Sequence, residues 1–135
     1  MIQLPRPLAD ALIAHAREGR PEEVCGIAAV SGDRVVSLHR ARNVAENKRM
    51  RFEIDSRDLL AVVELDRQGL EVGFYHSHPA SRAYPSQTDI AFARLWPGAL
   101  QLMVSLRADE TSGPELHAYR IEADVVREED LHIVE

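Results

Sequence analysis

The sequence has one cysteine, few aromatic residues and no long apolar run. The first and the last of these shortages exclude particular classes of protein. Cys25 is the only cysteine, so the chain can form no internal disulfide and no cysteine-rich structural zinc site. No stretch approaches the roughly 18 apolar residues of a membrane span, and the N-terminus has no apolar signal core. We therefore expect a cytoplasmic protein with no membrane segment.

The charge balance argues against a nucleic-acid partner. The 22 acidic and 16 basic side chains give a formal net charge of −6, and the basic residues are scattered along the chain. A phosphate backbone would be repelled by this balance. The length of 135 residues and the hydrophobic share of 45% are typical of one folded domain, which we expect to span residues 1–135.

The residue patterns predict an α/β fold of the α+β type. Helices are expected over residues 7–19, from Asp55 or Ser56 to Gly69, and from Ser86 to about residue 97. Strands are expected over residues 24–30, 34–39, 50–54, 72–78, 100–106 and 115–121, with a last edge piece within 125–134. Because hairpins alternate with strand–helix–strand crossovers, we expect a mixed, mostly antiparallel sheet flanked by about three helices.

Two histidines and an aspartate give the strongest chemical signal. Side chains at positions i and i+2 of a strand point to the same face, so His76 and His78 direct both imidazoles the same way. A catalytic zinc takes three protein ligands at about 2.0–2.2 Å and leaves a fourth position open. Asp89, in the first turn of the next expected helix, is the candidate for the third ligand. Pro79 ends the strand and turns the chain back over the histidines.

Each half of this pattern also has an ordinary structural explanation. Ser86-x-x-Asp89 fits a helix capping box, since a serine at the N-cap and an acid three residues later satisfy free amides at the helix start. A lone His-x-His is about as often without a metal as with one. The order of His-x-His-Pro at a strand end and Ser-x-x-Asp at a helix start is what indicates a metal site.

Other candidate residues have simpler interpretations when the residues alone are considered. Glu23 fits a solvated acid at a strand start, and Cys25 fits a small core residue because no activating partner is evident in the sequence. The remaining histidines lack ligand-like spacing; they are His15, His39, His117 and His132.

The segment His76-Ser77-His78-Pro79, followed after six residues by Ser86-Gln87-Thr88-Asp89, resembles the zinc motif of the JAMM/MPN+ metallopeptidases, the Mov34/MPN/PAD-1 group. The upstream segment Pro21-Glu22-Glu23-Val24-Cys25-Gly26 is similar to the proline, acid and Cys-Gly pattern of that family. The likeness extends over roughly residues 8 to 121. It implies a JAMM/MPN fold, which is of the cytidine-deaminase-like type.

The resemblance also implies a role for each residue of the motif. His76, His78 and Asp89 would bind Zn²⁺, which lowers the pKa of its water toward about 7. Glu23 would be the general acid/base that takes the proton and passes it to the leaving nitrogen, a role that typically contributes about 10²- to 10⁴-fold. Ser86 would donate a hydrogen bond to the oxyanion, a contact whose loss typically costs about 10²- to 10³-fold.

Within the family, Tyr75 to His78, Ala83 to Asp89 and Leu116 to Ile121 look similar to bacterial hydrolases of sulfur-carrier-protein–cysteine adducts. That resemblance implies a ubiquitin-like sulfur-carrier protein with a C-terminal Gly-Gly tail as the partner, and the release of cysteine in cysteine biosynthesis. Such a flexible tail would lie in a groove beside an edge strand. Pro79 departs from the threonine of some members of that branch and follows the general JAMM pattern. The oligomeric state stays open.

Three other functions share part of this pattern. A non-catalytic MPN binding module would lack ligands, whereas every ligand position is filled here. A zinc nucleobase deaminase needs His-x-Glu and Pro-Cys-x-x-Cys, which a single cysteine excludes. A JAMM isopeptidase that removes ubiquitin-like modifiers from lysines would use the same residues, so the sequence does not separate it from the carrier hydrolase.

Overall fold

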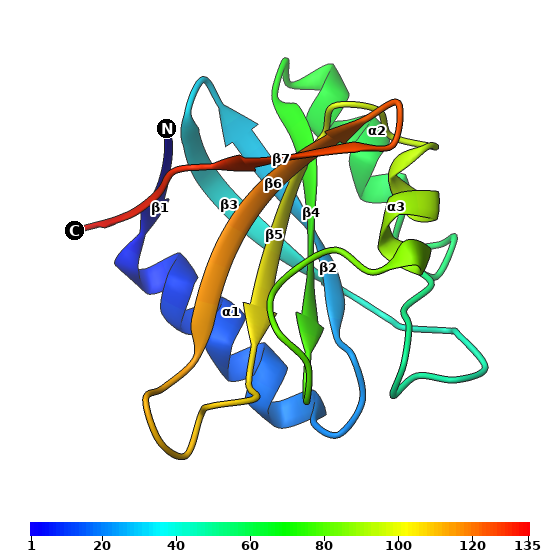
Figure 1. Ribbon diagram of the computed structural model, residues 1–135. Helices are drawn as coiled ribbons and strands as arrows, with labels where there is room; N and C mark the ends of the chain where they lie inside the picture. Colours follow the sequence, from blue (N-terminus) through cyan, green and yellow to red (C-terminus); the bar gives the residue numbers. More distant parts are fainter.

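An eight-stranded sheet forms the body of the protein in the computed structural model, which describes residues 1–135 (Figure 1). The elements in chain order are β1 (Ile2–Pro5), α1 (Arg6–Gly19), β2 (Cys25–Ser31), β3 (Arg34–Ala41), α2 (Leu60–Arg67), β4 (Glu71–His78), α3 (Gln87–Ala93), β5 (Leu100–Ser105), β6 (Glu115–Glu122), β7 (Val125–Glu129) and β8 (Leu131–Val134). The strand order is β7-β6-β5-β4-β2-β3-β1-β8.

The sheet is mixed, as the alternation of hairpins and crossovers predicted. Strand β4 runs parallel to β5, and β1 runs parallel to both β3 and β8. The other neighbouring pairs are antiparallel. Three helices cover the sheet, so the expected architecture of a mostly antiparallel sheet with about three helices is confirmed.

The apolar strand β2 explains why helices cover both faces of the sheet. Its residues alternate between two cores: Ala28 and Val30 pack with α1, whereas Cys25, Ile27 and Ala29 pack with α2 and α3. All of its residues except the last are buried. Figure 1 shows α1 on one side of the strands and α2 and α3 on the other. A strand buried on both faces reads as a continuous apolar run.

Gly26 of β2 makes room for the Tyr75 ring of β4 on the face of the sheet that α1 covers. A Cβ atom at Gly26 would overlap the ring of Tyr75 and would come within 2.6 Å of the carbonyl oxygen of His39. The Tyr75 ring therefore lies directly over the glycine, and no larger residue fits there without a shift of the ring.

The segment expected as a strand over residues 50–54 is not one, which corrects the sequence prediction. Only Ile54 makes an isolated bridge, to Asn43. The side chain of Asn43 takes up the other backbone groups of the segment: its Oδ1 accepts from the amides of Ala45 and Glu53, and its Nδ2 donates to the carbonyl of Arg51. Phe52 and Ile54 face the core whereas Met50 is exposed. The backbone is held by Asn43 together with two backbone hydrogen bonds, from Val44 to Glu53 and from Asp55 to Arg42, which are too few to make a strand.

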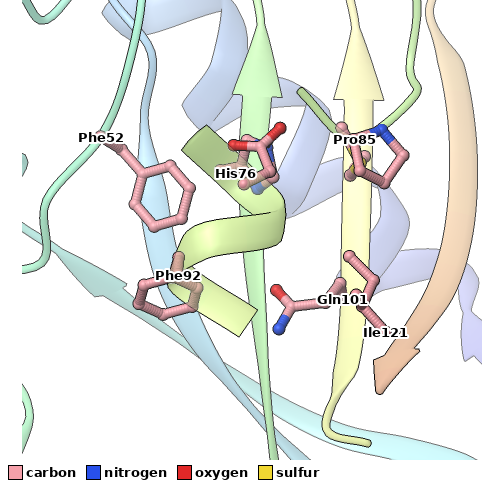
Figure 2. Close-up of a pocket in the computed structure, with 8 residues that line it drawn as sticks. Phe52, His76, Pro85, Phe92, Gln101 and Ile121 are labelled. Atoms are coloured by element: carbon pink, nitrogen blue, oxygen red, sulfur yellow. The ribbon is translucent and has the colours of Figure 1, made fainter. Parts of the chain in front are cut away.

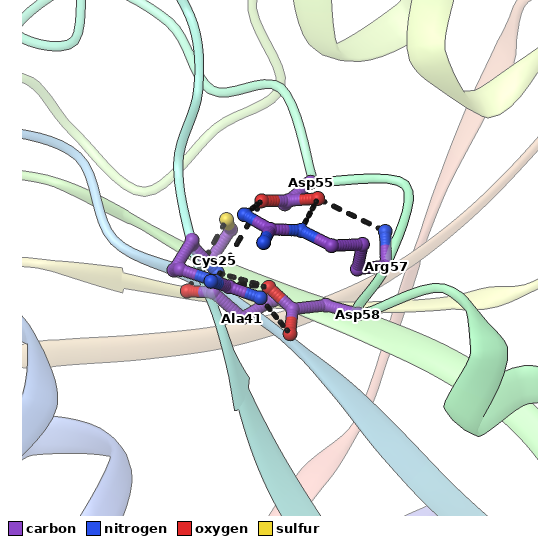
Figure 3. A network of polar contacts seen from close by, with 6 residues as sticks. Cys25, Ala41, Asp55, Arg57 and Asp58 are labelled. Carbon is purple, nitrogen blue, oxygen red and sulfur yellow. Dashed lines mark hydrogen bonds and ion pairs between the residues drawn. The ribbon is translucent and has the colours of Figure 1, made fainter.

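Helix α2 also begins later than expected, because Asp55 does not cap it. The carboxylate of Asp55 accepts from the amide of Arg57 at 2.9 Å and pairs with the Arg57 guanidinium. Asp58 accepts from the amide of Arg42 at 2.8 Å. Figure 3 shows these contacts beside Cys25 and Ala41. The two acids close turns between the end of β3 and residues 55–58, so the helix starts only at Leu60.

The C-terminal residues form two strands instead of the one edge piece that was expected. Strand β7 pairs with β6, whereas β8 pairs with β1 at the other end of the strand order. Strand β1 itself was not predicted, since its four residues end at a proline that starts α1. No helix in the structure combines the length and the apolar character that are needed to cross a membrane.

Candidate active site

The register of β2 against β4 brings the candidate acid to the candidate metal ligands. Cys25 pairs with His76 in antiparallel register, which places Glu23, just before β2, opposite His78. Ser77 fixes this alignment because its Oγ accepts from the amide of Val24 at 2.8 Å, and its amide donates to the Val24 carbonyl at 3.0 Å. The backbone pairing of β2 with β4 therefore aligns Glu23 with His78, although the two residues are far apart in the sequence.

Helix α3 carries Asp89 to the same place. Ser86 is its N-cap: the Ser86 Oγ accepts from the amide of Asp89 at 3.2 Å, and the Ser86 amide donates to Asp89 Oδ2 at 2.9 Å. The capping box and the candidate metal site thus share residues. The role of Ser86 and Asp89 in a helix capping box is therefore compatible with a place for Asp89 in the candidate metal cluster.

Four buried side chains converge in this cluster. One ligand atom from each lies within 4.8 Å of those of the others: Glu23, His76, His78 and Asp89. The two Nε2 atoms of His76 and His78 are 3.2 Å apart, and Asp89 Oδ2 lies 3.1 Å from the first and 3.0 Å from the second. The structure brings together all the ligand candidates and the candidate general base.

The hydrogen bonds of His78 show why a cation fits among these atoms. Its Nδ1 lies 2.8 Å from the carbonyl oxygen of Arg82, which can only accept, so Nδ1 carries the proton of the neutral ring. The Nε2 lone pair then points at Asp89 Oδ2, which is also an acceptor. A lone pair and a carboxylate 3.0 Å apart are held together by a positive charge between them, either a proton on Nε2 or a metal ion.

The separations match a tetrahedral metal. Bonds of about 2.0–2.2 Å in tetrahedral geometry put neighbouring ligand atoms roughly 3.3–3.6 Å apart. The observed triangle of 3.0–3.2 Å is slightly tighter and needs little movement to take an ion. Imidazole nitrogens with one carboxylate are a donor set suited to Zn²⁺ and related transition metals. The geometry and the donor set of this cluster therefore suit a metal ion.

The electrostatics of the cluster keep Asp89 ionised. Burial opposes its charge, but the two imidazoles and the amide of Ser86 hold the pKa of the Asp89 carboxyl far below its usual range. Burial likewise opposes a charged His78, yet the contacts with Asp89 and with the Arg82 carbonyl raise the pKa of His78. The environment of Asp89 and His78 therefore favours positive charge, as a metal site does.

Glu23 has the environment of a general base rather than of a solvated acid. Its side chain is buried and Oε1 has no hydrogen-bond partner. Burial raises the pKa of Glu23 to about 7, partly offset by the nearby imidazoles. Its backbone is fixed on both sides, by the carbonyl of Lys48 and by Asn43 Nδ2, which donates to the Glu23 carbonyl at 2.9 Å.

Side chains that no sequence pattern indicated hold the loop between His78 and Ser86. Three successive carbonyls each accept a hydrogen bond from a side chain of the sheet. Ser105 Oγ donates to Ser81, His78 Nδ1 to Arg82, and Tyr119 Oη to Ala83. Alternation could have signalled Ser105, because it faces the same side of the sheet as His78, its partner in register.

An aromatic wall closes one side of the cluster. The ring of Phe52 stacks on His76 with centroids 4.5 Å apart, and Phe92 packs edge-on against Phe52. Figure 2 shows these rings beside His76, with Pro85, Gln101 and Ile121 across from them. His76 Nδ1 and Gln101 Nε2 are buried here without partners. The polar contacts of the His76 ring are therefore made through Nε2, which faces Asp89 and His78.

A wide groove of about 1050 Å³ adjoins this wall. It runs between residues 45–59 and α3 and shares Phe52 and Phe92 with the wall. Leu95, which is 75% exposed, also lines it. An apolar groove with exposed side chains beside a polar cluster is the usual form of a binding site.

Cys25 is a buried core residue, as expected, and does not belong to the candidate metal cluster. It is fully buried, its Sγ is 3.9 Å from the carbonyl of Ala41, and burial raises the pKa of its thiol to about 12. A thiol in this state is not a nucleophile at neutral pH. Among the other histidines, His15 contacts Tyr75 and His117 contacts Glu128, and neither belongs to the cluster.

Comparison with known families decides the wider relationship. Residues 5–122 match the family described as prokaryotic homologs of the JAB domain. The chain belongs to this family. The JAMM/MPN+ resemblance that the zinc motif carried is thereby confirmed.

Relatives with named activities are similar over most of their length. The desampylase of Haloferax volcanii is 37% identical over 126 residues, which cover 84% of this chain and 90% of the relative. The CysO-cysteine peptidase of Mycobacterium tuberculosis is 37% identical over 131 residues, 95% of this chain and 88% of the relative. The prediction that this JAB-family chain is an enzyme is confirmed by these relatives together with the complete cluster.

Solved structures confirm the fold. A Desulfitobacterium hafniense protein solved in solution is 32% identical with a TM-score of 0.83, covering 100% of this chain and 94% of that protein. A JAB1/MPN domain protein from Archaeoglobus fulgidus is 21% identical with a TM-score of 0.66, covering 99% and 100%. The JAMM/MPN fold expected from the motif is the fold of this JAB-family chain.

Proposed function

We propose that this chain is a zinc-dependent hydrolase that cleaves the amide bond after the C-terminal Gly-Gly of a ubiquitin-like sulfur-carrier protein and releases cysteine. The convergence of Glu23, His76, His78 and Asp89 within 4.8 Å carries the proposal. The 37% identity to a CysO-cysteine peptidase supports the substrate. The proposal includes a single domain over residues 1–135 and action in the cytoplasm.

Each residue of the cluster, and the neighbouring Ser86, would have a distinct role in hydrolysis. His76, His78 and Asp89 would hold Zn²⁺, which when bound acidifies water and polarises the scissile carbonyl. Glu23, with its pKa near 7, would accept a proton and return it to the leaving nitrogen. Ser86 Oγ already accepts from the Asp89 amide, which leaves its O–H free to donate to the developing oxyanion.

The groove beside Phe52 is the proposed seat of the carrier's tail. It reaches the cluster on the side of His76 and exposes apolar side chains, which suit an extended tail and the apolar surface of a small folded partner. Removal of a ubiquitin-like modifier from lysine is the alternative, supported by the equal identity to a desampylase.

The test is incubation of the purified protein with a sulfur carrier that ends in Gly-Gly-Cys, followed by mass measurement. We expect the carrier to lose the mass of one cysteine. The Glu23→Gln variant should keep its metal and lose at least 10²-fold in rate, because Glu23 moves protons and does not bind the ion. Glu22→Gln is the matched control, since Glu22 is exposed and should leave the rate unchanged. Near-normal turnover by Glu23→Gln would refute its role.

A further inference from the structure

The basic side chains that lack an acidic partner are unevenly distributed. Most arginines of this acidic chain form an ion pair with a carboxylate. The basic residues outside these pairs are Arg34, Lys48, Arg49, Arg51 and Arg82. Arg34 contacts Gln3, and the other four belong to the two loops that border the cluster. Positive charge therefore stays available at the rim of the active site.

Arg82 is the most isolated of these cations. No acidic residue occurs between His78 and Asp89, whereas Glu46 and Glu53 lie in the other loop among its cations. The carbonyl of Arg82 accepts from His78 Nδ1 and from the amide of Tyr84, each at 2.8 Å. The residue is thus fixed one hydrogen bond away from a metal ligand.

The guanidinium group of Arg82 is supported but not neutralised. Its central carbon lies 4.6 Å from the centroid of the Tyr84 ring, and Tyr84 packs edge-on against Tyr119 with centroids 5.7 Å apart. A guanidinium stacked on an aromatic face keeps its N–H edge free, and this edge matches a carboxylate in bidentate geometry. The arrangement presents a preorganised donor for an anion.

The two candidate substrates differ in this one feature. Cysteine joined through its α-amine to the carrier's last glycine retains a free α-carboxylate next to the scissile bond. A modifier joined to a lysine side chain has no such group, because the lysine carboxyl lies in the peptide backbone. The groove reaches the cluster through Phe52, which stacks on His76, and the loop that carries Arg82 reaches it through the hydrogen bond from His78 to the Arg82 carbonyl. With the tail in the groove, the leaving amine would lie toward the Arg82 loop.

We infer that Arg82 binds the α-carboxylate of the leaving amino acid and makes the enzyme selective for carrier–amino acid adducts over lysine-linked modifiers. This inference rests on the proposed function and deepens it, since the equal identity to a peptidase and to a desampylase leaves the leaving group undecided. Arg82 is a specificity residue here and takes no part in proton transfer.

The test compares two carrier proteins that differ only in the C-terminal group of the last residue. One ends in Gly-Gly-Cys with a free carboxylate, and the other ends in Gly-Gly-cysteinamide. We expect the enzyme to cleave the acid about 10-fold or more better in kcat/KM, which is the scale of a charge-assisted bidentate contact that is partly exposed. In Arg82→Gln the acid should fall to the level of the amide, mostly through KM, and Arg82→Lys should restore part of the preference.

Control measurements separate the possible failures. Arg49→Gln removes an unpaired cation from the other loop and should leave the preference unchanged, and metal content should be normal in all variants. Equal cleavage of both carriers by the natural enzyme, or a preference that survives in Arg82→Gln, would overturn the inference and leave the proposed function standing. Failure to cleave either carrier would remove the proposed function and the inference with it.

Discussion

His78 Nδ1 donates to the carbonyl oxygen of Arg82 across 2.8 Å, and this contact links a candidate metal ligand to the loop that leads to Ser86. Outer contacts of this kind fix which nitrogen of a histidine is free for the ion. The neighbouring carbonyls of Ser81 and Ala83 are held by Ser105 and Tyr119. The position of the ligand therefore depends on side chains of β5 and β6 that never touch the metal.

Tyr119→Phe tests this dependence. Loss of the hydroxyl frees the Ala83 carbonyl and loosens the loop, so we expect about 10-fold weaker metal retention against a competing chelator, at the low end of the range for outer-contact changes. Tyr75→Phe makes the same chemical change on the opposite face of the sheet, where the hydroxyl contacts His15. It should leave metal affinity unchanged. Equal affinities in the two variants would show that the loop needs no tether.

Metal binding should stabilise the folded protein markedly. The atoms of His76, His78 and Asp89 converge in the folded protein only, and an ion that binds only the native state adds about 2.7 kcal/mol at a 100-fold excess over its Kd. For a domain of this size that corresponds to roughly 10 °C in melting temperature. Melting curves with Zn²⁺ and with a chelator measure the difference.

The variants for this experiment are Asp89→Asn and His117→Gln. The first removes the shared carboxylate and should abolish most of the metal-dependent shift. The second alters a half-buried histidine outside the cluster and should keep the full shift. A full shift in Asp89→Asn would place the ion somewhere else in the protein.

The convergence of the three candidate metal ligands could be predicted from the sequence because their spacing is local. His76 and His78 share a face through strand periodicity, and Asp89 follows in the capping box of the next helix. Glu23 lies far upstream, and only strand pairing brings it opposite His78. From composition alone it looked like a solvated acid, and the family resemblance was needed to select it. Register between distant strands is set by the whole sheet, which one segment does not encode.

The errors in the fold have a common physical cause. The alternating residues 50–54 resemble a strand, yet Asn43 satisfies the amide of Glu53 and the carbonyl of Arg51. Asp55 resembles a helix cap, yet it pairs with Arg57. In each case a side chain from another position competes for the backbone groups that regular structure would use. The Asn43 contacts join residues as far as ten positions apart, which strand periodicity does not predict, whereas the Asp55–Arg57 contact is local and competes directly with a helix cap.

The protein should lose stability between pH 6.5 and pH 4 through His15. Its Nδ1 lies 2.7 Å from Tyr75 Oη, and burial together with the charge of Arg40 lowers the pKa of His15 to about 4, partly offset by Glu18. The unfolded chain binds this proton near pH 6.5 and the folded protein only near pH 4. The unfolded state is therefore favoured as the pH falls through that window.

Denaturant unfolding of the natural protein and of His15→Gln at several pH values isolates this contribution, because the other titrating groups are common to both. We expect the natural protein to lose on the order of 1 kcal/mol more than the variant between pH 7 and pH 4, a figure reduced from the full pKa difference because the ring is half exposed to solvent. His132→Gln, at an exposed position, should behave like the natural protein. Parallel stability curves for the natural protein and His15→Gln would mean that His15 is protonated as readily in the fold as in the open chain.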